Sequence, residues 1–203
     1  MRNIVILDYG HGWDTPGKRS PDGLLREGRW TREVGPMLAR ELRELGLTVC
    51  EIITEKDDVS LQERCNRVND IVKKNPHDNI IFVSLHINAA PGTGWDDKAS
   101  GACVWVCKNA SESSVTLGQY YTEYMKLLNL QGNRSIPKEQ VWRANFKVLK
   151  STNCPAILTE NLFMTNHNEV KFLQSDLGKE TIVNLHILTI CKYFEIPCML
   201  VTD

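Results

Sequence analysis

The segment "NIIFVSLHIN", from Asn79 to Asn88, is an almost unbroken run of apolar residues. Such a run is typical of a strand that is buried on both faces, as the inner strands of parallel sheets are. Shorter apolar runs bounded by turn residues predict four further strands. They are "NIVIL" (residues 3–7), "LTVCEII" (residues 47–53), "GACVWVC" (residues 101–107) and "PAILTEN" (residues 155–161).

Between these runs, apolar residues recur at helical spacing. The pattern predicts helices over residues 34–46, 60–72, 117–128 and 182–194. The first ends at Gly46, and the second begins with a capping box, Ser60-x-x-Glu63. Pro36 is expected in the first turn of its helix, where a missing N–H costs little. Residues 142–148 alternate between apolar and polar and predict a half-buried strand.

Strands that alternate with helices predict an α/β fold in three layers, with a mainly parallel mixed sheet and helices on both faces. No repeat or low-complexity linker interrupts the chain, so we expect a single domain over residues 1–203.

The composition excludes several classes of function. The formal net charge of −1 favours neither nucleic acid nor an anionic membrane as a partner. No apolar stretch reaches the ~20 residues that span a bilayer, and no secretory leader is visible. The seven cysteines are odd in number and form no C-x-x-C pair, which argues against a disulfide framework or a zinc knuckle.

Four side chains suited to metal or acid–base chemistry fall near one edge of the predicted sheet. His11 lies between two glycines after the first strand, His86 lies near the end of residues 79–88, and Glu160 near the end of residues 155–161. Glu27 precedes the first long helix on the same side. Sites in open α/β sheets lie beyond the carboxyl ends of the strands.

These residue types match a catalytic zinc site, which takes three His or carboxylate ligands and keeps one position open. His11, Glu27 and His86 would be the ligands, Glu160 would transfer the proton of the attacking water, and the glycines beside His11 would let the backbone approach the metal. Each residue alone also has a structural explanation, such as a core histidine or a carboxylate at a helix start. The residues alone therefore give a metal-dependent hydrolase as a hypothesis.

Several segments together resemble a known family. They are "ILDYGHG", "DGLLREG", "SLQERCNRVND", "IFVSLHINAA", "ASGACVWV" and "VLKSTNCPAILTENLFMTN". In this order they are similar to the zinc-dependent N-acetylmuramoyl-L-alanine amidases of bacteria and their phages (amidase type 3), over nearly the whole chain. The resemblance implies one zinc ion per chain held by His11, Glu27 and His86, with Glu160 as the catalytic glutamate. It also implies a role for Asn88 in orienting this region or touching substrate, although an asparagine that forms a turn is an equal alternative.

The implied reaction is hydrolysis of the amide between N-acetylmuramic acid and the L-alanine that begins the stem peptide of peptidoglycan. Arg134 is a candidate for binding a carboxylate of that peptide, because a guanidinium matches carboxylate geometry. The loop "WDTPGKRSPDG" is longer and more basic than in many members. Some members carry a helix that occludes the zinc, but residues 91–98 are too short for one. We therefore expect an open site that needs no activator.

Two alternatives stay open at this point. Another zinc hydrolase acting on peptidoglycan, a carboxypeptidase or a deacetylase, would use similar residues, and a non-catalytic wall-binding protein could share the fold. We expect peptidoglycan as the partner, no nucleic acid, no membrane and a monomer. The chain would be made in the cytoplasm and act on the cell wall, as a phage or prophage lysin or as a secreted enzyme whose leader was removed.

Overall fold

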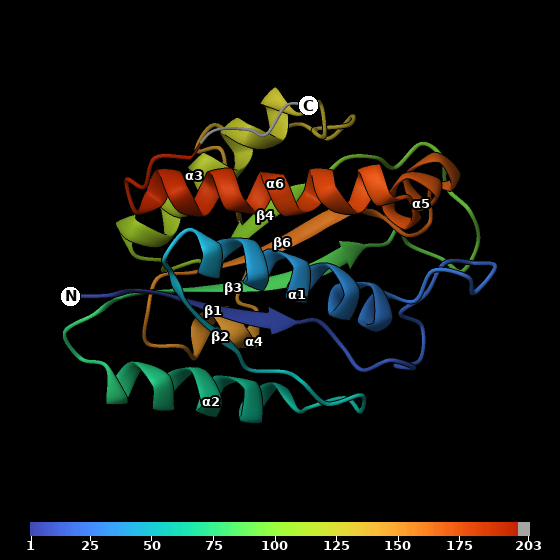
Figure 1. Ribbon diagram of the computed structural model, residues 1–203. Helices are drawn as coiled ribbons and strands as arrows, with labels where there is room; N and C mark the ends of the chain where they lie inside the picture. Colours follow the sequence, from blue (N-terminus) through green and yellow to red (C-terminus); the bar gives the residue numbers. More distant parts are fainter. Residues whose placement is uncertain (199–203) are drawn as a thin grey trace.

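The computed structural model describes residues 1–198, and six of their strands form one sheet in the order β2-β1-β3-β6-β4-β5 (Figure 1). The strands are β1 (Asn3–Tyr9), β2 (Thr48–Glu51), β3 (Asn79–Asn88), β4 (Cys103–Val106), β5 (Trp142–Arg143) and β6 (Ala156–Phe163). All neighbouring strands are parallel except β4 and β6, which are antiparallel. The mainly parallel mixed sheet is confirmed.

Helices cover both faces of the sheet (Figure 1). They are α1 (Glu27–Glu44), α2 (Leu61–Lys74), α3 (Glu112–Leu127), α4 (Lys147–Lys150), α5 (His167–Gln174) and α6 (Asp176–Tyr193). On one face α6 packs against α1, α3 and α5, and on the other α2 packs against α4. The three-layer α/β prediction is therefore confirmed. A single domain over the whole chain stays a prediction, because residues 199–203 lie outside the described part.

The local sequence signals explain how these elements begin and end. Nine of the ten residues of β3 are buried or half-buried, and Ile80 to Leu85 are buried throughout. Ser60 caps α2 by accepting a hydrogen bond from the backbone N–H of Glu63 at 3.2 Å, as the capping pattern predicts. Gly46 follows α1 with a φ of 83°, a conformation that glycine adopts without steric cost.

The predicted position of Pro36 is wrong. The helix begins at Glu27, so Pro36 lies inside α1 rather than in its first turn. Pro36 is on the exposed face, where water can satisfy the carbonyl that loses its helical partner. The first turns are held by tertiary contacts, including a hydrogen bond from the indole of the buried Trp30 to the carbonyl of Leu173 at 2.8 Å. The sequence pattern underestimated the helix because those contacts come from distant residues.

The predicted strand over residues 142–148 is also wrong. Only Trp142–Arg143 pairs, as β5, and Lys147–Lys150 forms the short helix α4. Val148 and Leu149 are both buried although they are adjacent, which a half-buried strand does not allow. Helix α5 was not predicted, and α6 begins at Asp176 rather than near Ile182.

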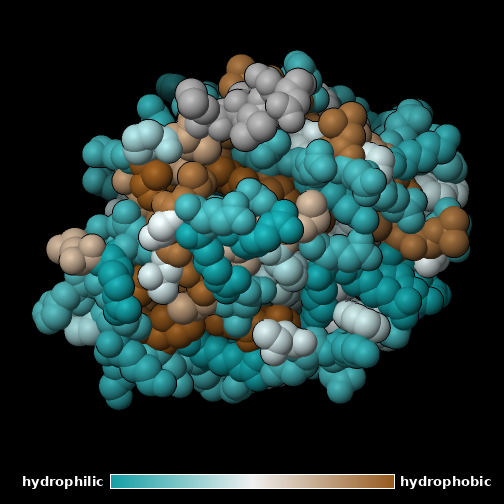
Figure 2. All heavy atoms as spheres, viewed as in Figure 1, coloured by the Kyte–Doolittle hydropathy of each residue, from teal (hydrophilic) through white to brown (hydrophobic). Residues whose placement is uncertain are grey.

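The face of the molecule shown in Figure 2 is mostly polar. On the face shown in Figure 2, hydrophilic residues cover most of the area and hydrophobic residues form smaller groups between them. Within residues 1–198, none of the helices has the length and apolar character that crossing a bilayer requires.

His186 is a buried histidine of α6 with a structural role. Its Nδ1 donates to the carbonyl of Ile182 at 2.7 Å, so its Nε2 accepts from the hydroxyl of Thr159 at 3.0 Å. Burial lowers the pKa of His186 to about 4, partly opposed by its backbone hydrogen bond. The neutral imidazole therefore links α6 to β6.

This shift predicts a loss of stability in acid. His186 takes up a proton less readily in the folded chain than in the unfolded chain, where it has the ordinary histidine pKa of 6.5. The contribution of neutral His186 is complete above pH 6.5 and falls as the pH drops toward 4, by about 3 kcal/mol in total. We expect urea unfolding with chelator present, followed by circular dichroism, to give a steeper loss between pH 6.5 and 4 for the native chain than for His186→Gln. Equal slopes would contradict this assignment.

Candidate active site

Three parallel strands and one helix meet at the edge of the sheet where the candidate residues lie. His11 follows the end of β1 by two residues, and Glu27 is the first residue of α1. His86 on β3 is directly opposite Glu160 on β6 in the parallel register. The order of the elements thus brings together four residues that are up to 149 positions apart in the sequence numbering, from His11 to Glu160.

His11, Glu27 and His86 form a compact cluster. One nitrogen of each imidazole and a carboxylate oxygen of Glu27 all lie within 4.8 Å of one another. Oε1 of Glu27 is 3.0 Å from Nδ1 of His86 and 3.5 Å from Nε2 of His11. The same oxygen accepts the backbone N–H of Ile87 at 3.0 Å, which fixes the carboxylate against β3.

The cluster fits a divalent transition metal. Glu27 is 1 % exposed, and its second oxygen, Oε2, has no hydrogen-bond partner among residues 1–198. A buried carboxylate oxygen without a partner is costly, and a bound cation removes that cost. Two imidazoles and one carboxylate are a donor set typical of zinc.

The protonation of these residues follows from burial and from their mutual charges. Burial lowers the pKa of His11 to about 4, so this imidazole is neutral and able to donate a lone pair. Burial alone would lower the pKa of His86, but its hydrogen bond and charge interaction with Glu27 outweigh burial and raise it. The same interactions hold the pKa of Glu27 below its usual value despite complete burial.

Glu160 lies on the wall of a cavity of 480 Å³ that His11 and His86 also line. Its Oε2 is buried without a hydrogen-bond partner in the described part of the chain. Burial, with the nearby charge of Glu27, raises the pKa of Glu160 to about 7, although the charges of His86, Lys18 and Arg134 oppose the rise. A carboxyl group with this pKa can both accept and release a proton near neutral pH.

The two glycines beside His11 are required by close contacts. A Cβ at Gly10 would lie 2.6 Å from ring atoms of His86, and a Cβ at Gly12 would lie 2.6 Å from the backbone nitrogen of Asp58. The sequence prediction attributed these glycines to the approach of the backbone to a metal. In the structure they make room for the second histidine and for the loop before α2.

Asn88 and Arg134 lie beside this cluster rather than on the cavity wall. The side-chain oxygen of Asn88 accepts the N–H of Ala89 at 2.9 Å, as a turn-forming asparagine does, and its amide is 4.0 Å from the sulfur of Cys103. Nη1 of Arg134 is 3.1 Å from the same sulfur. Cys103 pairs with Glu160 across β4 and β6, so both residues are neighbours of Glu160.

Arg134 is held by aromatic rings. Its guanidinium carbon is 5.2 Å from the ring centre of Trp142 and 5.9 Å from that of Trp105. None of the ion pairs within residues 1–198 involves Arg134. Its charge is therefore stabilised by cation–π contacts and stays available for an anion.

Sequence reasoning missed several residues of the site. Lys18, Phe146 and Arg64 line the cavity together with the candidate residues. Arg64 carried a signal, because it follows Leu61 by three positions and precedes Val68 by four, on the apolar side of α2. A charged residue on an apolar helix face indicates a buried partner. Lys18 lies in a loop and Phe146 directly precedes α4, and neither has such a signal in the sequence.

An α/β fold with a His-Glu-His cluster beside a buried carboxylate is a combination typical of metal-dependent hydrolases. A family model described as N-acetylmuramoyl-L-alanine amidase matches residues 5–192. The chain belongs to the N-acetylmuramoyl-L-alanine amidase family. It is a peptidoglycan amidase by family, and hydrolysis of the bond between N-acetylmuramic acid and L-alanine is the reaction that defines this class.

Individual relatives agree with this assignment. The chain is 28 % identical over 194 residues to the N-acetylmuramoyl-L-alanine amidase CwlM of Bacillus licheniformis, covering 95 % of this chain and 69 % of the relative. It is 29 % identical over 179 residues to the endolysin of Bacillus phage SPP1, covering 87 % of this chain and 60 % of the relative. The chain thus spans about two thirds of the length of these relatives.

A solved structure has the same fold. The crystal structure of the N-acetylmuramoyl-L-alanine amidase from Clostridium difficile 630 aligns with a TM-score of 0.82 at 22 % identity, covering 96 % of this chain and 97 % of that one. At this identity the likeness supports the fold.

Proposed function

We propose that this chain hydrolyses the amide between N-acetylmuramic acid and L-alanine with one zinc ion held by His11, Glu27 and His86. The observation that carries the proposal is the buried Glu27 carboxylate, which has an unpartnered oxygen and lies between two imidazoles. When bound, zinc would act as a Lewis acid that polarises the carbonyl of the substrate and lowers the pKa of water.

Glu160 is the proton carrier of this proposal. It accepts a proton from the attacking water at its buried Oε2 and passes that proton to the leaving nitrogen. Its raised pKa of about 7 suits both steps, because the carboxylate is basic enough to accept the proton and acidic enough to release it. His11 stays neutral in its half-buried position and serves only as a ligand.

The cavity supports a peptide-containing substrate. Its lining combines apolar side chains, Val59, Leu61 and Phe146, with the cationic Lys18 and Lys147. Neither lysine is in an ion pair within residues 1–198, so both can attract a carboxylate of the stem peptide. The segment 91–98 contains no helix, which supports the prediction of an open site that needs no activator.

Arg134 and Asn88 complete the proposed substrate site. Arg134 binds a carboxylate of the stem peptide with the guanidinium that rests on Trp142. Asn88 orients the end of β3, since its side chain is engaged with Ala89. We further propose that the protein acts on the cell wall as a monomer, either as a lysin or as an exported enzyme.

Digestion of purified sacculi tests the reaction. We expect free stem peptides that begin with L-alanine, together with intact acetylated glycan, and both are identified by mass analysis. Chelator should abolish release, and added zinc should restore it, because the proposed reaction needs the metal. Loss of terminal amino acids would indicate a carboxypeptidase, loss of acetyl groups a deacetylase, and binding without products a wall-binding protein.

Glu160→Gln separates proton transfer from metal binding. We expect the variant to retain one zinc per chain by elemental analysis, because Glu160 is not a ligand. Its kcat should fall by about 10²-fold to 10⁴-fold, the usual contribution of a positioned acid–base group. Glu180→Gln on the exposed side of α6 is the matched control and should keep full turnover. A fully active Glu160→Gln chain would remove Glu160 from the mechanism.

Arg134→Gln tests the carboxylate site. A hydrogen bond to a charged group contributes about 1.5–3 kcal/mol, so KM should rise by about 10-fold to 100-fold with little change in kcat. The rise should be seen with stem peptides whose carboxyl groups are free and should shrink when those groups are amidated. Arg143→Gln is the control, because Arg143 already binds Glu139 at 2.7 Å. A KM that rises equally with free and with amidated stem peptides would exclude this role for Arg134.

A further inference from the structure

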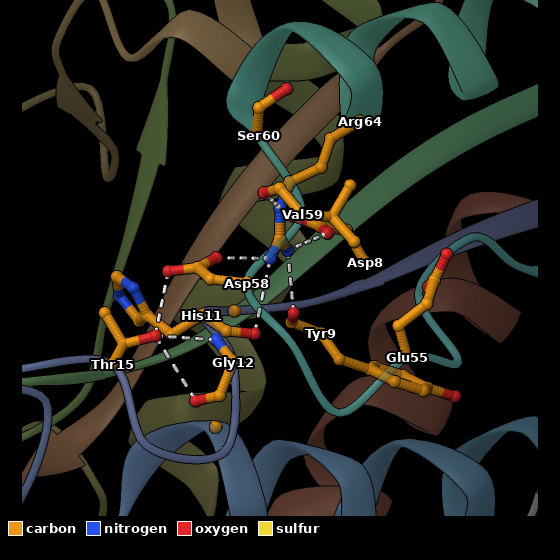
Figure 3. Close-up of polar contacts among 12 residues, drawn as sticks. Asp8, Tyr9, His11, Gly12, Thr15, Glu55, Asp58, Val59, Ser60 and Arg64 are labelled. Carbon is orange, nitrogen blue, oxygen red and sulfur yellow. Dashed lines mark hydrogen bonds and ion pairs between the residues drawn. The ribbon is translucent and has the colours of Figure 1, made fainter.

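Arg64 of α2 is a buried cation that reaches the loop after β1. Its side chain is 2 % exposed, and Figure 3 shows its guanidinium pointing into a group of oxygens from the end of β1 with its following loop and from the loop before α2. It donates to the following oxygens: Asp8 Oδ1 at 2.6 Å, Tyr9 O at 2.7 Å, Val59 O at 2.9 Å, Asp58 Oδ1 at 3.2 Å and His11 O at 3.3 Å. Two chains of hydrogen bonds connect Arg64 to the two candidate histidine ligands, His86 and His11.

The first branch runs through Asp8 to His86. Asp8 is paired with Arg64, and its second oxygen accepts the hydroxyl proton of Ser84 at 2.6 Å. Since the only proton of Ser84 is used there, its oxygen accepts from Nε2 of His86 at 3.1 Å. The contact with Ser84 therefore holds a proton on Nε2 of His86, and Nδ1, which lies 3.0 Å from Oε1 of Glu27, is the ring nitrogen left to bind a metal.

The second branch holds the peptide unit between His11 and Gly12. His11 has a φ of 60°, an uncommon conformation for a residue with a side chain. The carbonyl of this peptide unit accepts from Arg64, and its N–H donates to the hydroxyl of Thr15 at 2.8 Å. Thr15 in turn donates to Asp58 at 2.8 Å, and Asp58 is bound to Arg64, so the path closes on itself (Figure 3).

We propose that Arg64 is the positioning residue of the metal site: it fixes the proton of His86 through Asp8 and Ser84, and the conformation of His11 through the 11–12 peptide. This proposal rests on the proposed metal site. A buried ion pair such as Arg64–Asp8 gives little net stability compared with apolar packing, because both charges lose their hydration. A role in orienting ligands explains why Arg64 lies on an otherwise apolar face of α2 and pairs with Asp8 of β1. Hydrogen bonds to ligating histidines fix the ring and its proton in this way.

Ser84→Ala tests the first branch. In wild type, the Nε2 proton of His86 should give a slowly exchanging downfield proton signal, with zinc and without it. Ser84→Ala should broaden that signal and weaken zinc binding by about 10-fold to 100-fold in competition with a chelator. Ser114→Ala is the matched control. Ser114 is also buried and accepts a backbone N–H at 3.0 Å, but it lies on α3 away from the site, so zinc affinity should not change.

Thr15→Val tests the second branch. Removing the hydroxyl leaves the 11–12 peptide held only at its carbonyl, so hydrogen exchange at the Gly12 amide should accelerate and zinc affinity should fall. Thr15→Ser retains the hydroxyl and should restore both properties. Arg64→Lys, where it folds, should show both defects together, because one ammonium cannot reach all five oxygens.

The outcomes separate this proposal from the proposed function. Wild-type zinc affinity in both Ser84→Ala and Thr15→Val would overturn the positioning role of Arg64 while leaving the metal site intact. Failure of the wild-type chain to bind zinc would overturn the metal site instead. In that case the His86 proton signal in Ser84→Ala and the Gly12 exchange rate in Thr15→Val still show whether the two hydrogen-bonded branches fix the positions of the histidines.

Discussion

Strand β3 is hydrogen-bonded in parallel to β1 on one side and to β6 on the other, and this register sets the position of each reacting group. It places Asp8 opposite Ser84 and His86 opposite Glu160. Ser84 and His86 are two residues apart and therefore share one face of the sheet. A slip of one residue would turn His86 to the other face, away from Glu27 and Glu160. The alignment of the sheet thus brings together the candidate ligand, its hydrogen-bond partner and the proposed proton carrier.

Much of the fold could be predicted because its signals are local. The apolar run of β3, the cap at Ser60 and the stop at Gly46 each depend on neighbouring residues, and each was interpreted correctly. The errors arose where distant contacts decided the structure. Pro36 is tolerated inside α1 because it faces solvent while the buried face of the helix packs on the sheet and α6. Residues 147–150 form a helix, in which the adjacent Val148 and Leu149 are both buried in the core.

The candidate site was predicted in part for a similar reason. His11, Glu27, His86 and Glu160 could be chosen because chemically capable residues at the carboxyl ends of parallel strands converge, and the structure brings these four together. The contacts that orient them were not predictable. Thr15 and Asp58 reach His11 through loops whose path depends on tertiary packing, and only Arg64 had a recognisable signal. Asn88 and Arg134 meet at Cys103, one strand away from the cavity, which no spacing in the sequence indicates.

Asp8 and Glu27, the two acidic residues at the site that are almost completely buried, have different neighbours. Asp8 and Glu27 are each 1 % exposed, and a buried negative charge needs a compensating cation. For Asp8 that cation is the side chain of Arg64, whose Nη1 is 2.6 Å from Oδ1 of Asp8. For Glu27 the neighbours within reach are two imidazoles, which neutralise it only by taking up a proton. The permanent pair therefore orients the surrounding groups, whereas the carboxylate without a permanent cation is the one suited to bind an exchangeable ion. Orientation and binding are thus divided between two acids that lie on either side of His86.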